Sequence, residues 1–136
     1  MNTYALYAFA DEAGGDLQMQ ILAMQRNQLQ GLELRNVNGI NVSALTLAQA
    51  KEIRQQLDAA GLKVWSAGSP IGKIDIVKDD YPAHLEALRN TIAVAHALGT
   101  DNIRMFSFYL PTGEDPATYR NQVLDRLNEM AAIAKA

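Results

Sequence analysis

Short apolar runs alternate with longer amphipathic stretches along the chain. The strand-like runs cover residues 4–10, 32–37, 62–68 and 103–109. After each run, apolar residues recur every three or four positions, which is the spacing of a helix that buries one face. The order strand then helix, repeated four times, predicts parallel strands joined by helical crossovers.

Polar residues and glycines mark the expected helix ends. An N-cap side chain accepts a hydrogen bond from the first turn, and a glycine after the last turn adopts a positive φ at low cost. The predicted N-caps are Asp16, Thr46 (in a capping box with Gln49) and Asp115 before Pro116, with a further helix start near Asp80; the predicted terminal glycines are Gly31, Gly61 and Gly99.

Charge on one strand face favours a barrel over an open sheet. In residues 32–35 leucines alternate with Glu33 and Arg35, and Arg104 stands between two apolar residues in the fourth run. Central strands of an open flavodoxin-like sheet are apolar on both faces, so that alternative is disfavoured. Four βα units in 136 residues are half of a barrel of about 250 residues. We therefore predict an α/β fold, a (βα)4 half of a TIM barrel, in a single domain over residues 1–136.

Composition narrows the function classes. Hydrophobic residues make up 49% of the chain, the net charge is −3 and there are no cysteines. The charge gives no footprint for nucleic acid or anionic lipid, and thiolate chemistry and Cys-based metal sites are excluded. No apolar run is long enough to span a membrane and no signal-peptide pattern opens the chain, so a cytoplasmic location is expected.

Candidate site residues follow the strand ends, where α/β folds position their chemistry. Glu33 is the candidate catalytic residue, and the candidate substrate-binding residues are Glu12, Arg35, Ser69, Lys73 and Arg104. Each has a structural alternative. Glu33 and Arg35 can form an ion pair inside the barrel, joined by Arg104, and this interpretation is favoured because buried charges need partners. Lys73 can be a solvated loop charge, and Ser69 a turn hydroxyl bonded to backbone.

For the other polar and aromatic residues, a structural role is the favoured interpretation. Asp11 and Glu12 can line a polar pocket, but serving the next turn and the helix dipole is preferred. The histidines His84 and His96 lack the i, i+4 spacing of a metal pair and are assigned to packing or surface roles. Trp65, Phe106 and Phe108 are expected in the core, with sugar stacking as the minority view.

Three segments together resemble a known family. Gly31-Leu-Glu-Leu-Arg35, Gly68-Ser-Pro-Ile-Gly-Lys73 and Ile103-Arg-Met-Phe-Ser-Phe108 look like the first half of the xylose-isomerase-like TIM barrels, the sugar phosphate isomerase/epimerase superfamily. This superfamily also includes hydroxypyruvate-isomerase-like and endonuclease-IV-like proteins. The resemblance covers nearly the whole chain.

The resemblance implies a parent enzyme that isomerises or epimerises a small sugar or hydroxy-keto acid with a divalent metal. The family's metal-binding glutamate comes from the fifth strand and its other ligands from later strands. No position here matches them, so no metal ligand is carried over and no tightly bound metal is expected from this chain alone. We expect no catalysis without a second half; the alternative is a non-catalytic half-barrel that self-assembles or binds a sugar.

The exposed edges of a half-barrel predict self-association. A sheet with free edges and an uncovered inner face, here including Phe106 and Phe108, invites pairing. Two copies related by a two-fold axis can close an eight-stranded ring. We therefore expect a homodimer joined at the edges of strands one and four.

Overall fold

The sheet of the computed structural model is parallel and follows the order of the sequence. The model describes residues 4–136. Strands β1 (Tyr7–Phe9), β2 (Gly31–Leu34), β5 (Lys63–Gly68) and β6 (Ile103–Arg104) are neighbours in that order. All three pairings are parallel. Successive strands of a TIM barrel are arranged in this way, whereas a flavodoxin-like sheet has the order 2-1-3. The predicted half-barrel fold is confirmed, and the open-sheet alternative does not fit.

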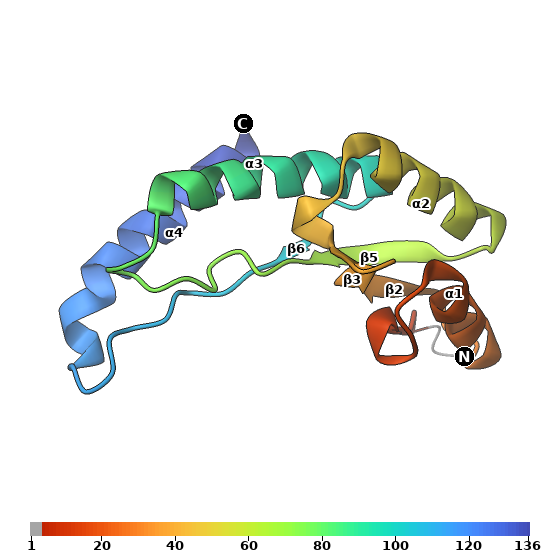
Figure 1. Cartoon of the computed structure of the whole chain (residues 1–136), viewed down its shortest axis with the longest axis horizontal. Helices are drawn as coiled ribbons and strands as arrows, with labels where there is room; N and C mark the ends of the chain where they lie inside the picture. The colour runs from red at the N-terminus through yellow and green to blue at the C-terminus, as the bar shows by residue number, and fades with distance from the viewer. Residues whose placement is uncertain (1–3) are drawn as a thin grey trace.

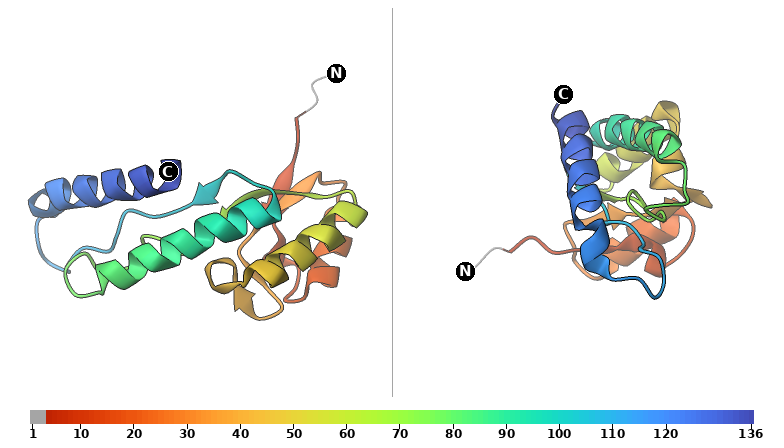
Figure 2. Two further views of the ribbon diagram at one scale, coloured as in Figure 1. Left: turned by 90° about the horizontal axis from the view of Figure 1, so that it is seen from above. Right: turned by 90° about the vertical axis from the view of Figure 1, so that its left-hand side faces the viewer.

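Helices cover one face of this sheet. In Figure 1, α2 (Leu47–Ala59) and α3 (Tyr81–Leu98) lie along one side of the strands. Figure 2 shows α4 (Arg120–Lys135) beside α3, and α1 (Leu17–Arg26) connects β1 to β2. The main core lies between helices and strands and includes Leu32, Leu34 and Val64. Among residues 4–136, no helix is both long and apolar enough to cross a membrane.

Most of the predicted helix caps are confirmed. The Asp16 carboxylate accepts a hydrogen bond from the Met19 N–H, and Thr46 and Gln49 form a capping box. Gly99 closes α3 with a left-handed φ of 80°. Asp115 caps a short 3₁₀ segment, η3 (Pro116–Tyr119), that leads into α4.

Gly31 has a different role from the predicted one. Helix α1 ends at Arg26, with Asn27 as its C-cap, and Gly31 is the first residue of β2. A Cβ at Gly31 would lie 1.9 Å from the carbonyl oxygen of Lys63. Glycine is therefore required by the close approach of β2 to β5, and not by a helix end.

The strands are shorter than their sequence patterns. The first run forms only three strand residues before a 3₁₀ segment, η1 (Ala10–Glu12). The fourth forms only two. Both lie at the edges of the sheet, so each has one neighbour to define its ladder. The second run also divides: β3 (Asn36–Val37) pairs with β4 (Ile40–Asn41) in a small antiparallel hairpin before η2 (Val42–Ala44).

The face of the sheet opposite the helices is polar and aromatic. The predicted core position of Trp65 is wrong, because 52% of this residue is exposed and its ring stacks on Tyr7 with centroids 5.5 Å apart. Phe108 does not lie exposed on the inner face. It packs beside Ile71 and Leu88 in a second hydrophobic cluster, which lies between the loop after β5 and helices α3 and α4.

Candidate active-site cleft

A cleft of about 540 Å³ opens where the carboxyl ends of the strands meet. The parallel register brings the residues that follow β1, β2, β5 and β6 to this one edge of the sheet. Its lining includes Arg35, Ser69, Lys73 and Arg104, all of which are predicted site residues. The structure thus brings together most of the candidates from three separate segments.

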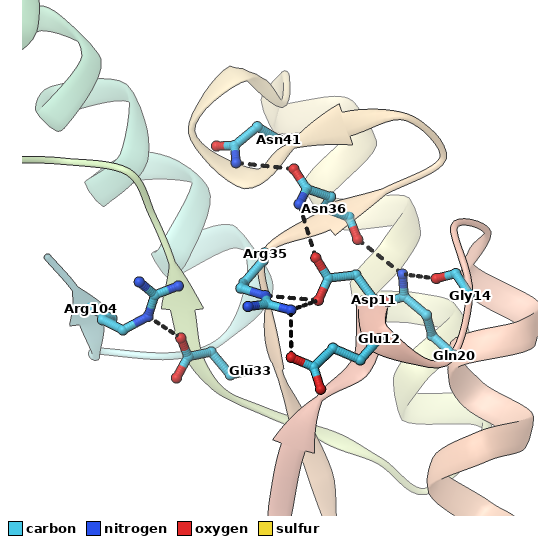
Figure 3. Close-up of polar contacts among 9 residues, drawn as sticks. All are labelled: Asp11, Glu12, Gly14, Gln20, Glu33, Arg35, Asn36, Asn41 and Arg104. Atoms are coloured by element: carbon cyan, nitrogen blue, oxygen red, sulfur yellow. Dashed lines mark hydrogen bonds and ion pairs between the residues drawn. The ribbon is translucent and has the colours of Figure 1, made fainter. Parts of the chain in front are cut away.

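Asp11 and Glu12 hold Arg35 in place (Figure 3). The Arg35 Nε donates to Asp11 Oδ1 at 2.8 Å, and its Nη2 to Glu12 Oε1 at 3.1 Å. Burial alone would lower the pKa of Arg35, but the hydrogen bonds and charges of the two carboxylates outweigh it and raise this pKa. Both acids lie in the short 3₁₀ turn after β1, as the favoured turn interpretation has it, but they also compensate a cation of the neighbouring strand, and Asp11 lines the cleft.

Glu33 pairs with Arg104 and not with Arg35. The Arg104 Nε lies 2.5 Å from Glu33 Oε1, across the intervening strand β5. The residue of β5 between them is Gly68, whose missing Cβ would lie 2.7 Å from Glu33 Oε1 and 2.6 Å from Arg35 Cγ. The predicted structural ion pair therefore exists with a different partner, and the glycine gives the long side chains room to cross β5.

Aromatic rings support the cations of the cleft. The Arg35 guanidinium carbon lies 4.3 Å from the centroid of the Phe9 ring. Lys73 Nζ lies 4.4 Å, and the Arg104 guanidinium carbon 5.0 Å, from the centroid of Phe106. Such cation–π contacts fix the position of a charged group without neutralising it. Arg35 and Arg104 have carboxylate partners, whereas the Lys73 ammonium group lies over the Phe106 ring.

Ser69 is a structural link in the wall of the cleft. It is 1% exposed, its hydroxyl donates to the Arg104 carbonyl at 2.7 Å, and the Ile71 N–H points back to its Oγ at 3.3 Å. This is the backbone-bonded role that was the structural alternative for Ser69.

Helix α3 contacts the loop that carries Lys73. The Gly72 N–H donates to His84 Nε2 at 2.8 Å, so this nitrogen is an unprotonated acceptor. Burial lowers the pKa of His84, partly offset by the charge of Asp79. Gly72 has a φ of 85°, and a Cβ there would lie 1.8 Å from the Phe106 carbonyl. Gly72 and His84 together fix the backbone beside Lys73. His96, by contrast, is exposed on α3 near Asp101.

Comparison with known proteins assigns the chain to a family. The family model for the xylose isomerase-like TIM barrel matches residues 13–136. The chain belongs to the xylose isomerase-like TIM barrel family. No curated protein sequence matches it significantly.

Solved structures with the same fold are about twice as long as this family member. A 3-keto-D-glucoside 4-epimerase from E. coli has a TM-score of 0.69 and 16% identity, over 97% of this chain and 52% of its own. D-psicose 3-epimerase, solved in the presence of D-fructose, has a TM-score of 0.70 and 14% identity, over 95% and 48%. A xylose isomerase-like protein from Mycobacterium smegmatis, in complex with magnesium, has a TM-score of 0.66 and 16% identity, over 96% and 51%.

The magnesium in one of these structures raises the question of a divalent metal. In this xylose isomerase-like chain the carboxylates of the cleft face arginines: Asp11 and Glu12 face Arg35, and Glu33 faces Arg104. Within residues 4–136, no three acidic or histidine side chains lie close enough together to hold a metal ion. The donors present therefore do not fit a divalent metal.

Some cleft residues were missed by the sequence patterns. Asn36 donates from Nδ2 to Asp11 at 2.9 Å, and Asn41 donates to Asn36 at 3.1 Å. The buried Gln20 donates to the carbonyls of both Gly14 and Asn36 (Figure 3). Asn36, Gly39 and Asn41 are turn-forming residue types, and that composition was the available signal for the hairpin.

Proposed function

We propose that this chain supplies one half of a sugar isomerase or epimerase barrel. Its cleft binds a small polyhydroxylated sugar or hydroxy-keto acid, with Lys73, Arg35 and Arg104 as donors. Turnover requires a second half-barrel, because in this half the carboxylates are engaged by arginines and do not provide a metal site. The parent reaction is the metal-dependent proton or hydride shift between a carbonyl and a neighbouring hydroxyl carbon.

One observation carries this proposal: cationic side chains from separate strands and loops converge on one cleft at the carboxyl edge of the sheet. Functional sites of TIM barrels lie at this edge. Of these three donors, Lys73 lies over an aromatic ring, whereas Arg35 and Arg104 each also bind a carboxylate, so Lys73 is the donor chosen for the test below. Epimerases of sugars with the same fold support the ligand class.

D-fructose is a suitable probe for the binding step. We expect its addition to shift the amide NMR signals of Gly68, which lines the cleft, and of Gly72, which precedes the cleft residue Lys73. Lys73→Gln is expected to weaken this binding about tenfold, the cost of one charge-assisted hydrogen bond. Lys78→Gln is the matched control, because Lys78 is exposed outside the residues that line the cleft. Absence of shifts at the cleft, or equal effects of both variants, would contradict the proposal.

A turnover assay shows whether this half of the barrel contains a complete active site. We expect the isolated chain with D-fructose and Mg²⁺ to form no epimer. Formation of D-psicose by the monomeric chain would show that this half suffices and would overturn the requirement for a second half.

The second candidate is a non-catalytic half-barrel that self-assembles or binds a sugar. The ion pair between Glu33 and Arg104 favours it, because Glu33 Oε1 is already engaged by the Arg104 guanidinium and is not free to contact a substrate. D-fructose binding without Mg²⁺-dependent turnover by the assembled species is its expected result. A cytoplasmic location remains part of the proposal for both candidates.

A further inference from the structure

The inner face of the half-barrel is uncovered and both of its edges are free among residues 4–136. β1 and β6 each pair with one neighbour only. Trp65 is 52% exposed and Phe9 40% exposed on the face opposite the helices. Free parallel edges beside an exposed aromatic face are the features of a surface that another set of strands covers.

The inner side chains are arranged in layers made by alternate strands. Tyr7 of β1 stacks on Trp65 of β5, although β2 lies between these strands. Glu33 of β2 reaches Arg104 of β6 across β5. In a complete TIM barrel, four residues from alternate strands fill one layer. This chain therefore supplies two members of an aromatic layer and two members of a charged layer.

A two-fold axis completes the charged layer with alternating signs. The order of strands around such a ring is β1, β2, β5, β6 and then the same four from the second copy. The second and fourth strands of each copy, β2 and β6, contribute the charged residues. Around the ring these are Glu33, Arg104, Glu33 of the second copy and Arg104 of the second copy. Each carboxylate then has an arginine on both sides, and no like charges are neighbours in the layer.

The layer nearer the cleft alternates in size. Phe9 of β1 and Gly68 of β5 line the same cleft, and both belong to the odd strands. The two-fold ring orders them as Phe9, Gly68, Phe9 and Gly68, and the space over each glycine is the one that the Glu33 and Arg35 side chains cross. Alternation of large and small residues is how the interiors of small barrels are filled.

We propose that a second copy of this chain covers the inner face and closes an eight-stranded ring, with β6 of each copy against β1 of the other. The structural neighbours extend over about twice this length, so the space to be filled equals one more half. Charge complementarity favours a second copy as the partner. At both places where β6 of one copy meets β1 of the other, Arg104 of the first copy can pair with Glu33 of the second. Closure does not depend on whether the cleft binds a sugar.

The decisive measurement combines mass with the fluorescence of the single tryptophan. Light scattering after size exclusion is expected to give twice 14.9 kDa. Trp65 is the only tryptophan of the chain, so its emission should move to shorter wavelength and resist acrylamide quenching as the concentration rises. A mass of 14.9 kDa at high concentration with a quenchable Trp65 would overturn the proposal, as would open-ended oligomers.

Charge variants test the layer itself. Glu33→Arg gives four arginines in the layer and is expected to weaken the dimer by at least about a hundredfold, as for an uncompensated buried charge. The double variant Glu33→Arg with Arg104→Glu restores alternation and should restore the dimer. Asp58→Arg breaks the exposed Arg54–Asp58 pair on α2 and is the control that leaves the mass unchanged.

Circular dichroism of each variant shows whether the monomer is folded. A folded Glu33→Arg chain that remains dimeric would overturn the proposal, because its dimer would use another surface. A folded double variant that remains monomeric would overturn it as well. If the single variant unfolds, the double variant and the tryptophan measurement on the unmodified chain decide.

Discussion

Gly31 lies where the sheet leaves no room for a side chain. Its missing Cβ would be 1.9 Å from the Lys63 carbonyl oxygen, in the ladder between β2 and β5. We expect Gly31→Ala to force these central strands apart and to lower the free energy of unfolding by about 3 kcal/mol, within the range of severe backbone strain. Urea denaturation followed by circular dichroism measures this loss.

Gly15 is the matched control for Gly31→Ala. A Cβ at Gly15 meets no atom within 4 Å, and its φ is not in the left-handed region. Gly15→Ala should therefore change the free energy of unfolding by less than about 0.5 kcal/mol. Equal losses for the two variants would show that the spacing of β2 and β5 is not the cause.

His84 makes stability depend on pH. Its neutral Nε2 accepts a hydrogen bond from Gly72, and burial lowers its pKa below 6.5, with Asp79 acting in the opposite direction. The unfolded chain therefore takes up a proton first. Stability contributed by His84 is present above pH 6.5 and is lost as the pH falls below 6.5 toward the lower folded-state pKa.

Glutamine substitutions isolate this contribution. His84→Gln keeps an acceptor near Gly72 but does not titrate, so its melting temperature should fall less than that of the unmodified chain as the pH drops below 6.5. His96→Gln removes the exposed histidine and should keep the original dependence. Parallel pH profiles for the His84→Gln variant and the unmodified chain would contradict the assignment.

The capping box at the start of α2 is a local source of helix stability. Thr46 accepts from the Gln49 N–H, and the Gln49 side chain accepts from the Thr46 N–H at 2.9 Å. Thr46→Ala is expected to lower the free energy of unfolding by about 1 kcal/mol. Thr112→Ala, in the exposed loop before η3, is the control and should change it little. Chemical denaturation of both variants distinguishes the cap from a general effect of losing threonine.

Helix starts could be predicted because their signals are local, and strand ends could not because they depend on a partner. The hydrogen bonds of Asp16 and Thr46 join residues three apart, so the sequence contains both partners. Residues 103–109 have a strand pattern throughout, but only Ile103–Arg104 join the sheet. Beyond them, Phe106 and Phe108 donate to the backbone of Ile71 and Gly72 in the neighbouring loop.

The position of the cleft could be predicted from the strand topology, but the pairing of its charged side chains could not. Parallel strands bring their carboxyl ends to one edge, so Arg35, Lys73 and Arg104 could be predicted to converge. The choice of Arg104 for Glu33, and of Asp11 for Arg35, depends on which side chains cross a neighbouring strand. Alternation along a strand gives the face of a residue but not its partner.

The stability of this chain should depend on its own concentration. A folded dimer of half-barrels is favoured by mass action, and a monomer is not. We expect the melting temperature to rise as the protein concentration increases from micromolar to hundreds of micromolar. Calorimetry over this range measures the rise, and the Glu33→Arg variant should show none. A constant melting temperature for the unmodified chain would indicate a stable monomer.

Gly68 also predicts a genetic interaction. Any side chain at this position meets Glu33 Oε1 and the Arg104 guanidinium, so a mutational library should tolerate little there. Glu33→Ala removes the carboxylate that a new side chain at position 68 would meet. Gly68→Ala should therefore be less harmful in a Glu33→Ala background than alone. Such positive epistasis means that the residues tolerated at position 68 depend on which residue is present at position 33.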